Sequence, residues 1–149
     1  MLDSINKLIT DLYEVETLKS KRLRHTLSFP FIMMMIVPLV FFDFFLEIYH
    51  RICFPMYRIP LVERRKYIRY DRHKLNYLNW LEKIFCAYCG YANGLVHYGM
   101  VIAGETEKYW CAIKHQKNNG FVAPPHHKEF AEFGDEKQFR EIQTKFRKE

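Results

Sequence analysis

The stretch from Thr26 to Phe42, TLSFPFIMMMIVPLVFF, is the part of the sequence that decides the class of protein. It carries no charge, and apolar side chains continue beyond Asp43. A segment that crosses the hydrocarbon core of a bilayer needs about 20 apolar residues. We therefore expect residues 26–49 to form a membrane segment rather than the buried helix of a soluble protein. Asp43 is expected to lie at the depth of the interface or to pair with a cation, the alternative being a functional acid inside the membrane.

The flanks of this segment leave its topology open. Basic residues precede it between positions 19 and 24 and follow it between positions 51 and 66, so the positive-inside rule favours neither orientation. Pro38 lies in the middle, where it removes a helical hydrogen bond and favours a kink. A single span and a re-entrant hairpin both fit this pattern, and we favour the single span. In either case the many cations after the segment favour a cytoplasmic C-terminal domain.

The whole pattern predicts a mostly α-helical chain of four parts. Residues 1–25 are an amphipathic helix with a basic collar, and the membrane segment follows. Residues 50–74 are an interfacial connector rich in basic and aromatic side chains, and residues 75–149 are a small helical domain with cysteines and histidines. Gly99 and Gly104 weaken the helical pattern of that domain and are where the chain is expected to turn back.

The formal charge of +6 and a pI of about 9.1 favour an anionic partner. Because the basic side chains cluster beside the membrane segment, phospholipid headgroups are the simplest partner. A nucleic-acid-binding strip with stacking tyrosines over residues 63–74 is the less favoured alternative. The N-terminal helix is acidic, so it is expected to pack on a protein partner or on the chain's own domain. The residues assigned to the membrane surface are Lys21, Arg22, Arg24, Arg64, Arg65, Lys66 and Arg69.

Three of the four cysteines belong to the pattern that points most directly to chemistry. Cys86 and Cys89 have the C-x-x-C spacing of a metal-binding knuckle, and Cys111 and His115 are one helical turn apart. Thiolates and imidazoles are the ligands that tetrahedral zinc and mononuclear iron use. The sequence therefore predicts a metal site, with zinc as the first choice and rubredoxin-like iron as the second. Its ligands are Cys86, Cys89, Cys111 and His115.

This metal site requires the chain to fold back on itself. One unbroken helix from Ala92 to Cys111 would be about 28 Å long and would keep the two pairs of ligands apart. Other interpretations of the thiols stay open: a redox-active Cys86/Cys89 pair, a disulfide, or plain buried thiols. A site filled by three cysteines and one histidine is closed, which argues against a zinc hydrolase.

The pair His126-His127 follows two prolines near the end of the chain. We expect it to be a loop pair exposed to solvent, and the alternative is that it supplies metal ligands or contacts phosphate. A little further on, Asp135-x-x-Gln138 predicts the start of a terminal helix, because the spacing is that of a capping box.

A resemblance to known proteins is carried by several short runs. The chain resembles a group of small uncharacterised bacterial membrane-associated proteins over about residues 30–140. This resemblance implies a bacterial origin and a location in the inner (cytoplasmic) membrane, but no activity. Members of the group tend to have proline after the third cysteine, where this chain has Ala112. The runs are Cys53-Phe-Pro-x-Tyr57, Asp71-Arg72-His73, Cys86-x-Tyr-Cys89-x-Tyr91-x-Asn93-Gly94 and Tyr109-Trp110-Cys111-x-Ile113-Lys114-His115.

Together these observations favour a membrane-anchored accessory or binding module that is stabilised by a Cys3His metal site. The alternatives are a membrane-bound thiol oxidoreductase, an enzyme acting at the lipid interface, and a nucleic-acid-binding module tethered to the membrane. The sequence does not decide whether the protein is an enzyme.

Overall fold

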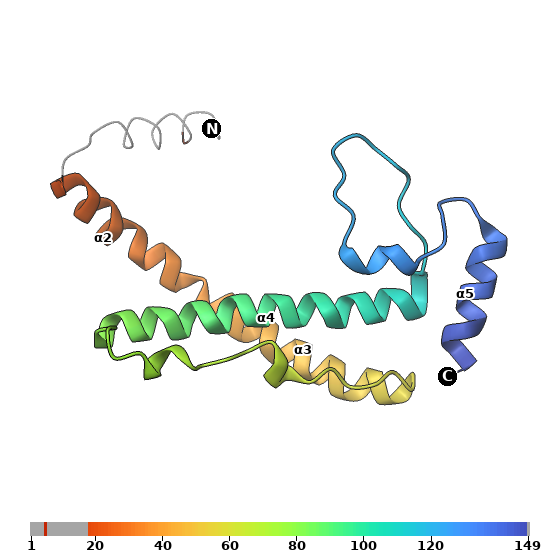
Figure 1. Cartoon of the computed structure of the whole chain (residues 1–149), viewed down its shortest axis with the longest axis horizontal. Helices are drawn as coiled ribbons and strands as arrows, with labels where there is room; N and C mark the ends of the chain where they lie inside the picture. The colour runs from red at the N-terminus through yellow and green to blue at the C-terminus, as the bar shows by residue number, and fades with distance from the viewer. Residues whose placement is uncertain (1–4, 6–17, 149) are drawn as a thin grey trace. The chain divides into compact units, whose positions relative to one another are not determined.

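The computed structural model describes Ile5 and residues 18–148, and these residues are mostly helical, as predicted. No strand occurs among them, and the amphipathic helix expected at the N-terminus lies largely outside them. The chain divides into two compact units, Met1–Phe41 and Phe42–Glu149. The α-helices and 3-10 helices (η) of the described residues are α2 (Leu18–Met34), α3 (Ile36–Met56), η1 (Arg64–Lys66), η2 (Arg72–Lys74), α4 (Trp80–Cys111), η3 (Pro125–Glu129) and α5 (Glu136–Lys148) (Figure 1).

A helix long and apolar enough to cross a membrane runs from Leu23 to Met56. None of the residues in its most apolar window is buried against the rest of the chain. The helical assignment is interrupted at Met35, between α2 and α3. The interruption lies one turn before Pro38, because proline has no N–H to donate to the carbonyl group four residues earlier. The helix is thus interrupted within one turn of Pro38, the residue at which the sequence predicts a kink.

The side chains of this helix are large, apolar and exposed. Phe31, Phe41 and Phe45 are exposed to 68%, 61% and 62% of their full accessible surface. Soluble monomers rarely expose a continuous apolar surface of this extent, and membrane contact is one of its usual causes. The helix therefore has the length and the surface that the predicted membrane segment requires.

The long helix α4 begins at Trp80 because Asn79 caps it. The side-chain oxygen of Asn79 accepts a hydrogen bond from the backbone N–H of Glu82 (2.9 Å), and the carboxylate of Glu82 accepts one from the backbone N–H of Asn79 (2.8 Å). This reciprocal pair is a capping box, which satisfies N–H groups that the first turn leaves free. Helix α4 consequently starts at Trp80. This is five residues after Leu75, the residue at which the sequence predicts the helical domain to begin.

Helix α4 continues without interruption through Gly99 and Gly104. The turn predicted at one of these glycines is therefore wrong. A glycine inside a helix costs only about 1 kcal/mol relative to alanine, which packing can outweigh. At Gly94 the reason for the missing side chain is visible, because a Cβ atom there would lie 2.7 Å from the carbonyl oxygen of Tyr67. The glycines of α4 allow close approach of neighbouring segments and do not reverse the chain.

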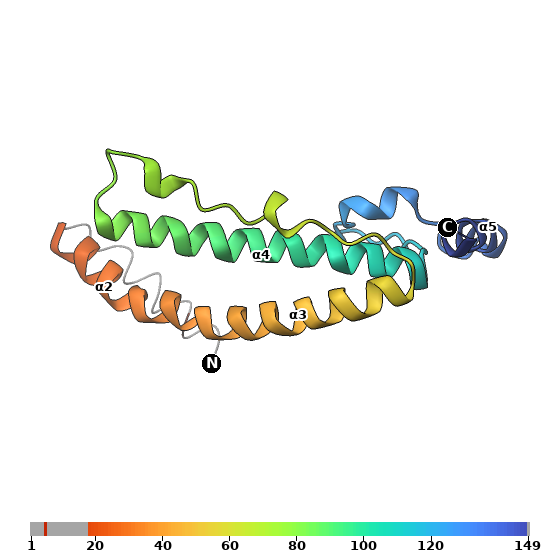
Figure 2. The same cartoon turned by 90° about the horizontal axis from the view of Figure 1, so that it is seen from below.

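In the second unit the connector between α3 and α4 runs back along α4, so that these two helices point in the same direction (Figures 1 and 2). Early in this pairing Tyr98 of α4 donates a hydrogen bond to Glu47 of α3 (3.0 Å). At its far end the rings of Tyr57 and Tyr109 are stacked, with centroids 5.1 Å apart. The fully buried side chains of this region include Phe54, Leu95, Tyr98 and Ile102.

After α4 the chain forms a loop and returns to the end of the helix. Ala131 donates its N–H to the carbonyl oxygen of Ala112 (2.9 Å) and accepts a hydrogen bond from the N–H of Lys114 (2.8 Å). Phe130 and Ala131 are buried by this pairing. The return places η3, which directly precedes Phe130, against the last turns of α4.

The terminal helix α5 begins where the sequence predicts it. The carboxylate of Asp135 accepts a hydrogen bond from the backbone N–H of Gln138 (2.9 Å), which is the expected cap. The side chain of Gln138 does not complete a capping box, since it accepts from the N–H of Glu132 instead (2.7 Å). Further along α5 the ring of Phe146 lies 4.4 Å from the ammonium group of Lys108 on α4.

Candidate metal centre

The structure does not bring the four predicted metal ligands together. Cys86 and Cys89 lie near the start of α4, and Cys111 is its last residue. A helix rises about 1.5 Å per residue, so Cys111 lies about 33 Å from Cys89 along the axis. His115 follows Cys111 and is exposed, with its ring against Phe121 (centroids 5.1 Å apart). The predicted Cys3His site is therefore wrong within one chain, because a single rigid helix separates the two pairs.

A different cluster of ligand types forms at the C-terminal end of α4. Glu107, His126 and His127 each offer one ligand atom, and these atoms all lie within 4.8 Å of one another. One carboxylate oxygen of Glu107 is 2.8 Å from Nε2 of His126, and the other is 3.1 Å from Nε2 of His127. Each imidazole thus faces a different oxygen of the same carboxylate. Among the described residues this is the group that could hold a metal ion.

Local sequence explains how the two histidines reach Glu107. Pro125 opens η3, since a proline at the start of a helix has the required φ and needs no hydrogen bond there. The ring of His127 stacks on Phe130, with centroids 4.9 Å apart and planes inclined by 27°. His126 rests on α4 at Gly104, where a Cβ atom would lie 3.0 Å from Nδ1 of the imidazole. Glycine at this position therefore allows the histidine to approach the helix.

The cluster combines an ionised carboxylate with a buried imidazole. Burial by itself would raise the pKa of Glu107, but the hydrogen bonds to His126 and His127 outweigh burial and lower this pKa. The carboxyl group is consequently ionised at neutral pH. His127 is only 3% exposed, and its Nδ1 is buried with no hydrogen-bond partner among the described residues. The nitrogen of His127 that faces Glu107 is Nε2, so an ion bound between these two residues would use Nε2 and would leave Nδ1 as it is.

The two histidines have a predicted environment, but the acid that they face, Glu107, is not among the predicted site residues. The expectation that His126-His127 is exposed to solvent is wrong, because His127 is buried and His126 is half-buried. The consecutive prolines before the pair were the local sign of a rigid, ordered segment. Nothing in the linear spacing connects the pair to Glu107, which belongs to another element and comes close only when the chain returns after α4.

A second polar cluster lies between α3, η1 and α4. The guanidinium group of Arg64 forms ion pairs with Asp43 and with Glu47, the latter at 3.2 Å. The hydrogen bond from Arg64 to Asp43 and the negative charge of that carboxylate raise the pKa of Arg64. The prediction that Asp43 pairs with a cation is confirmed. The assignment of Arg64 to lipid headgroups is corrected, because its charge is directed to the two acids.

The tyrosine and histidine of this second cluster complete a chain of hydrogen bonds. Nε2 of His50 accepts from the backbone N–H of Val62 (2.9 Å), so a neutral His50 carries its proton on Nδ1. That proton is then donated to the hydroxyl oxygen of Tyr98 (3.0 Å), and Tyr98 donates to Glu47 (3.0 Å). Burial, together with the hydrogen bond to Glu47, raises the pKa of Tyr98 to about 12.

The other residues predicted at the membrane surface have varied surroundings. Arg65 and Arg69 are exposed, and Lys66 is exposed while forming an ion pair with Glu63 (3.0 Å). Arg24 is half-buried on α2. The side chains of Lys21 and Arg22 lie outside the described residues. Arg65, Lys66 and Arg69 are thus the residues of this predicted set whose side chains are exposed in the described part of the chain.

The three ligand types at Glu107, His126 and His127 are suited to binding a metal ion that keeps an open coordination position. Two imidazoles and one carboxylate are a combination that binds zinc, and three protein ligands leave at least one position of a tetrahedral ion open. An open position can take water or a group of a substrate, whereas four protein ligands would close the site. No protein-family model, no curated protein and no solved structure matches the chain.

Proposed function

We propose that this protein is a membrane-anchored module that binds a metal ion through Glu107, His126 and His127. The observation that carries the proposal is the convergence of these three ligand types within 4.8 Å, around a histidine that is almost fully buried. Zinc is the first choice, because imidazole and carboxylate together suit it well, and iron is the second.

The separation between Glu107 and each histidine is close to that which a bound ion needs, and the ligand atoms of all three residues lie within 4.8 Å of one another. Zinc binds imidazole nitrogen and carboxylate oxygen at about 2.0–2.2 Å, so neighbouring ligand atoms in a tetrahedral site are about 3.3 Å apart. The two contacts between Glu107 and the histidines are 2.8 and 3.1 Å. An ion would replace the protons shared across these contacts, and small rotations of the side chains would accommodate it.

The helix from Leu23 to Met56 would serve as the membrane anchor. Its exposed apolar surface and the exposed cations Arg65, Lys66 and Arg69 support a position in which headgroups meet the part of the connector that lies beside Asp43. The density of cations after the helix favours a cytoplasmic location for the part of the chain that follows Met56, at the bacterial inner membrane. Lipid is accordingly the partner that we propose.

An enzyme acting at the lipid interface is the second candidate function. It is favoured by the number of ligands, because a three-ligand site keeps a position for a water molecule that the metal can activate. A closed Cys3His site would have argued against such chemistry. The cluster at Glu107 does not carry that objection.

Zinc binding to the purified full-length protein in detergent tests the proposal. We expect about one zinc ion per chain, measured by elemental analysis and by calorimetric titration. Substitutions Glu107→Gln and His126→Ala should each remove most of the binding, because each deletes one of three ligands. The matched controls are Cys86→Ser and Cys111→Ser, which should bind zinc as the wild type does.

The same experiment can overturn the proposal in two ways. A wild-type protein that binds no zinc and no iron would refute the metal site. A protein that loses its metal in the cysteine variants, and keeps it in the Glu107 and His126 variants, would restore the thiols as ligands. In that case two copies of the chain would have to supply them, because α4 separates Cys89 from Cys111.

A further inference from the structure

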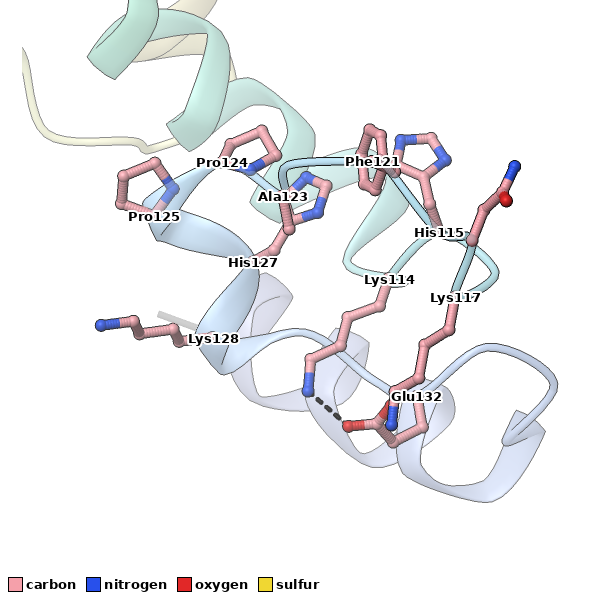
Figure 3. Close-up of a pocket in the computed structure, with 11 residues that line it drawn as sticks. Lys114, His115, Lys117, Phe121, Ala123, Pro124, Pro125, His127, Lys128 and Glu132 are labelled. Carbon is pink, nitrogen blue, oxygen red and sulfur yellow. Dashed lines mark hydrogen bonds and ion pairs between the residues drawn. The ribbon is translucent and has the colours of Figure 1, made fainter.

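A pocket of about 370 Å³ is lined in part by His127, one of the three residues of the metal cluster (Figure 3). Its walls come from the loop after α4, from η3 and from Glu132, which follows η3. His127 belongs both to this pocket and to the cluster with Glu107. The ring of His115, which also lines the pocket, has its centroid 5.5 Å from that of His127. The volume is within the range of sites that bind small molecules.

The polar side of the pocket carries more positive than negative charge. Figure 3 shows that the side chains of Lys114 and Lys117 both extend toward Glu132, and Lys114 forms an ion pair with this carboxylate. Two ammonium groups therefore face one carboxylate, and one positive charge is left without compensation. Lys128 also lines the pocket, but its side chain points away from this group in Figure 3.

The other side of the pocket is apolar. Phe121, Ala123, Pro124 and Pro125 line it, and the ring of His115 meets the ring of Phe121 edge to face. A pocket with an apolar wall and a few convergent charges fits a ligand that has an anionic head and an apolar remainder.

We propose that this pocket binds a phosphate monoester group next to the metal ion, an inference that rests on the metal site proposed above. A divalent ion with Lys114 and Lys117, set against Glu107 and Glu132, leaves two positive charges. A phosphate monoester carries a charge of about −1.5 to −2 at neutral pH and three acceptor oxygens, so it matches this balance. Within the pocket Lys117 would donate a charge-assisted hydrogen bond to the phosphate group, and an ion held by the cluster would add its positive charge from the side of His127.

The phosphate group could belong to a lipid headgroup or to a soluble ester. Both have the same chemistry at the pocket, and they differ only in where the apolar remainder lies. A phosphodiester headgroup carries a single negative charge, so the balance of charges favours a monoester over a diester. The phosphate group is therefore the part of the ligand that the pocket recognises, and competition with lipids identifies the molecule that carries it.

The test is calorimetric titration of inorganic phosphate into the zinc-loaded full-length protein, after free zinc has been removed. Lys117→Ala should weaken phosphate binding about tenfold, since a hydrogen bond between charged groups is lost, and should leave zinc affinity unchanged. Lys128→Ala is the matched control, because it removes the same charge from a side chain that points away, and it should bind phosphate within about twofold of the wild type.

Competition in nanodiscs identifies the source. Phosphatidic acid in a phosphatidylcholine bilayer should lower the apparent phosphate affinity if the natural ligand is a headgroup. Unchanged phosphate binding in these nanodiscs supports a soluble monoester instead. Phosphatidylglycerol, a diester, should not compete in either case.

Failure of this inference is distinguishable from failure of the metal site. A protein that binds zinc but no phosphate refutes the phosphate pocket alone, whereas a protein that binds no metal refutes the metal site first. Equal losses of phosphate binding in Lys117→Ala and Lys128→Ala would show a general charge effect and would overturn the assignment. Competition by phosphatidylglycerol as strong as that by phosphatidic acid would overturn the preference for a monoester.

Discussion

Two polar clusters of the second unit differ in how completely their groups are paired. In the cluster around Arg64, the guanidinium group faces Asp43 and Glu47, and the hydroxyl group of Tyr98 joins Glu47 to His50. In the cluster around Glu107, two imidazoles share one carboxylate, and Nδ1 of the buried His127 has no partner among the described residues. The first cluster is complete with the protein's own groups, and the second is not.

This difference separates a structural role from a binding role. A fully hydrogen-bonded network that contains an arginine holds neighbouring elements together, because each of its buried groups depends on the others. A cluster of three metal-ligand types around one carboxylate can add the free energy of binding an ion to that of its own contacts. We therefore expect substitutions in the first cluster to lower stability, and substitutions in the second to remove metal binding with little loss of stability.

The largest expected effect is that of Arg64→Ala. This change leaves Asp43 of α3 without its cation and leaves Glu47 with Arg51 as its remaining ion pair (2.9 Å), and we expect it to lower the free energy of unfolding by about 2–3 kcal/mol. Thermal unfolding in detergent, followed by circular dichroism, measures this. The control is Arg65→Ala, an exposed neighbour that should change stability by less than about 0.5 kcal/mol. Equal effects of the two substitutions would show that the Arg64 network does not hold the helices together.

The next effect is that of Tyr98→Phe, which should cost about 1–2 kcal/mol because His50 and Glu47 both lose a partner. The pKa of Tyr98 is raised to about 12 from an ordinary value of 10.0. Between these two values the unfolded chain loses the tyrosine proton while the folded chain keeps it, so stability falls as the pH rises from 10 to 12.

The variant should show a weaker decline over this alkaline range. The remaining decline is expected from Tyr91, whose pKa is also raised to about 12 by burial and by its hydrogen bond to Asp43. Unfolding measured at several alkaline pH values in wild type and in Tyr98→Phe makes the comparison. Identical pH dependence in the two proteins would contradict the hydrogen-bond chain.

The smallest expected change in stability is that of His127→Phe in the metal-free protein. The substitution removes one hydrogen bond to Glu107 but also removes the unpaired Nδ1 atom, and phenylalanine retains the stacking on Phe130. These contributions oppose each other, so we expect a change of less than about 1 kcal/mol.

The same variant should lose the response to zinc. In the wild type, zinc at 100 times its dissociation constant should stabilise the fold by about 2.7 kcal/mol, which thermal unfolding with and without zinc measures. His115→Phe is the control, since His115 is exposed and lies outside the cluster, and it should keep the zinc response. A large loss of stability in metal-free His127→Phe would place this histidine with the structural cluster instead.

The features that could be predicted from sequence are local ones. The apolar helix follows from an unbroken run of apolar residues, and the start of α5 follows from the spacing of Asp135 and Gln138. The pairing of Asp43 with a cation follows from the cost of leaving an acid alone in an apolar stretch. The identity of that cation, Arg64, was not predictable, because a run of basic residues offers several candidates at similar separations.

The predicted Cys3His site is wrong within one chain because the spacings of its two ligand pairs, Cys86/Cys89 and Cys111/His115, also fit an ordinary helix. Cys86 and Cys89 lie near the start of α4 and Cys111 ends it, and no property of these residues alone tells a knuckle from a helical turn. The glycines between them were interpreted as turn signals, but they serve contacts with other segments. Those contacts are properties of the tertiary structure, so the continuity of α4 could not be read along the chain.

What the sequence by itself determined is the presence of a long apolar helix and the predominantly helical character of the rest, because both depend on composition and on short-range spacing. Only the tertiary structure decided which side chains meet. Glu107 reaches His126 and His127 because the chain after α4 returns and rests on Gly104. Such a meeting depends on the packing of separate elements, and separation along the chain carries no information about it.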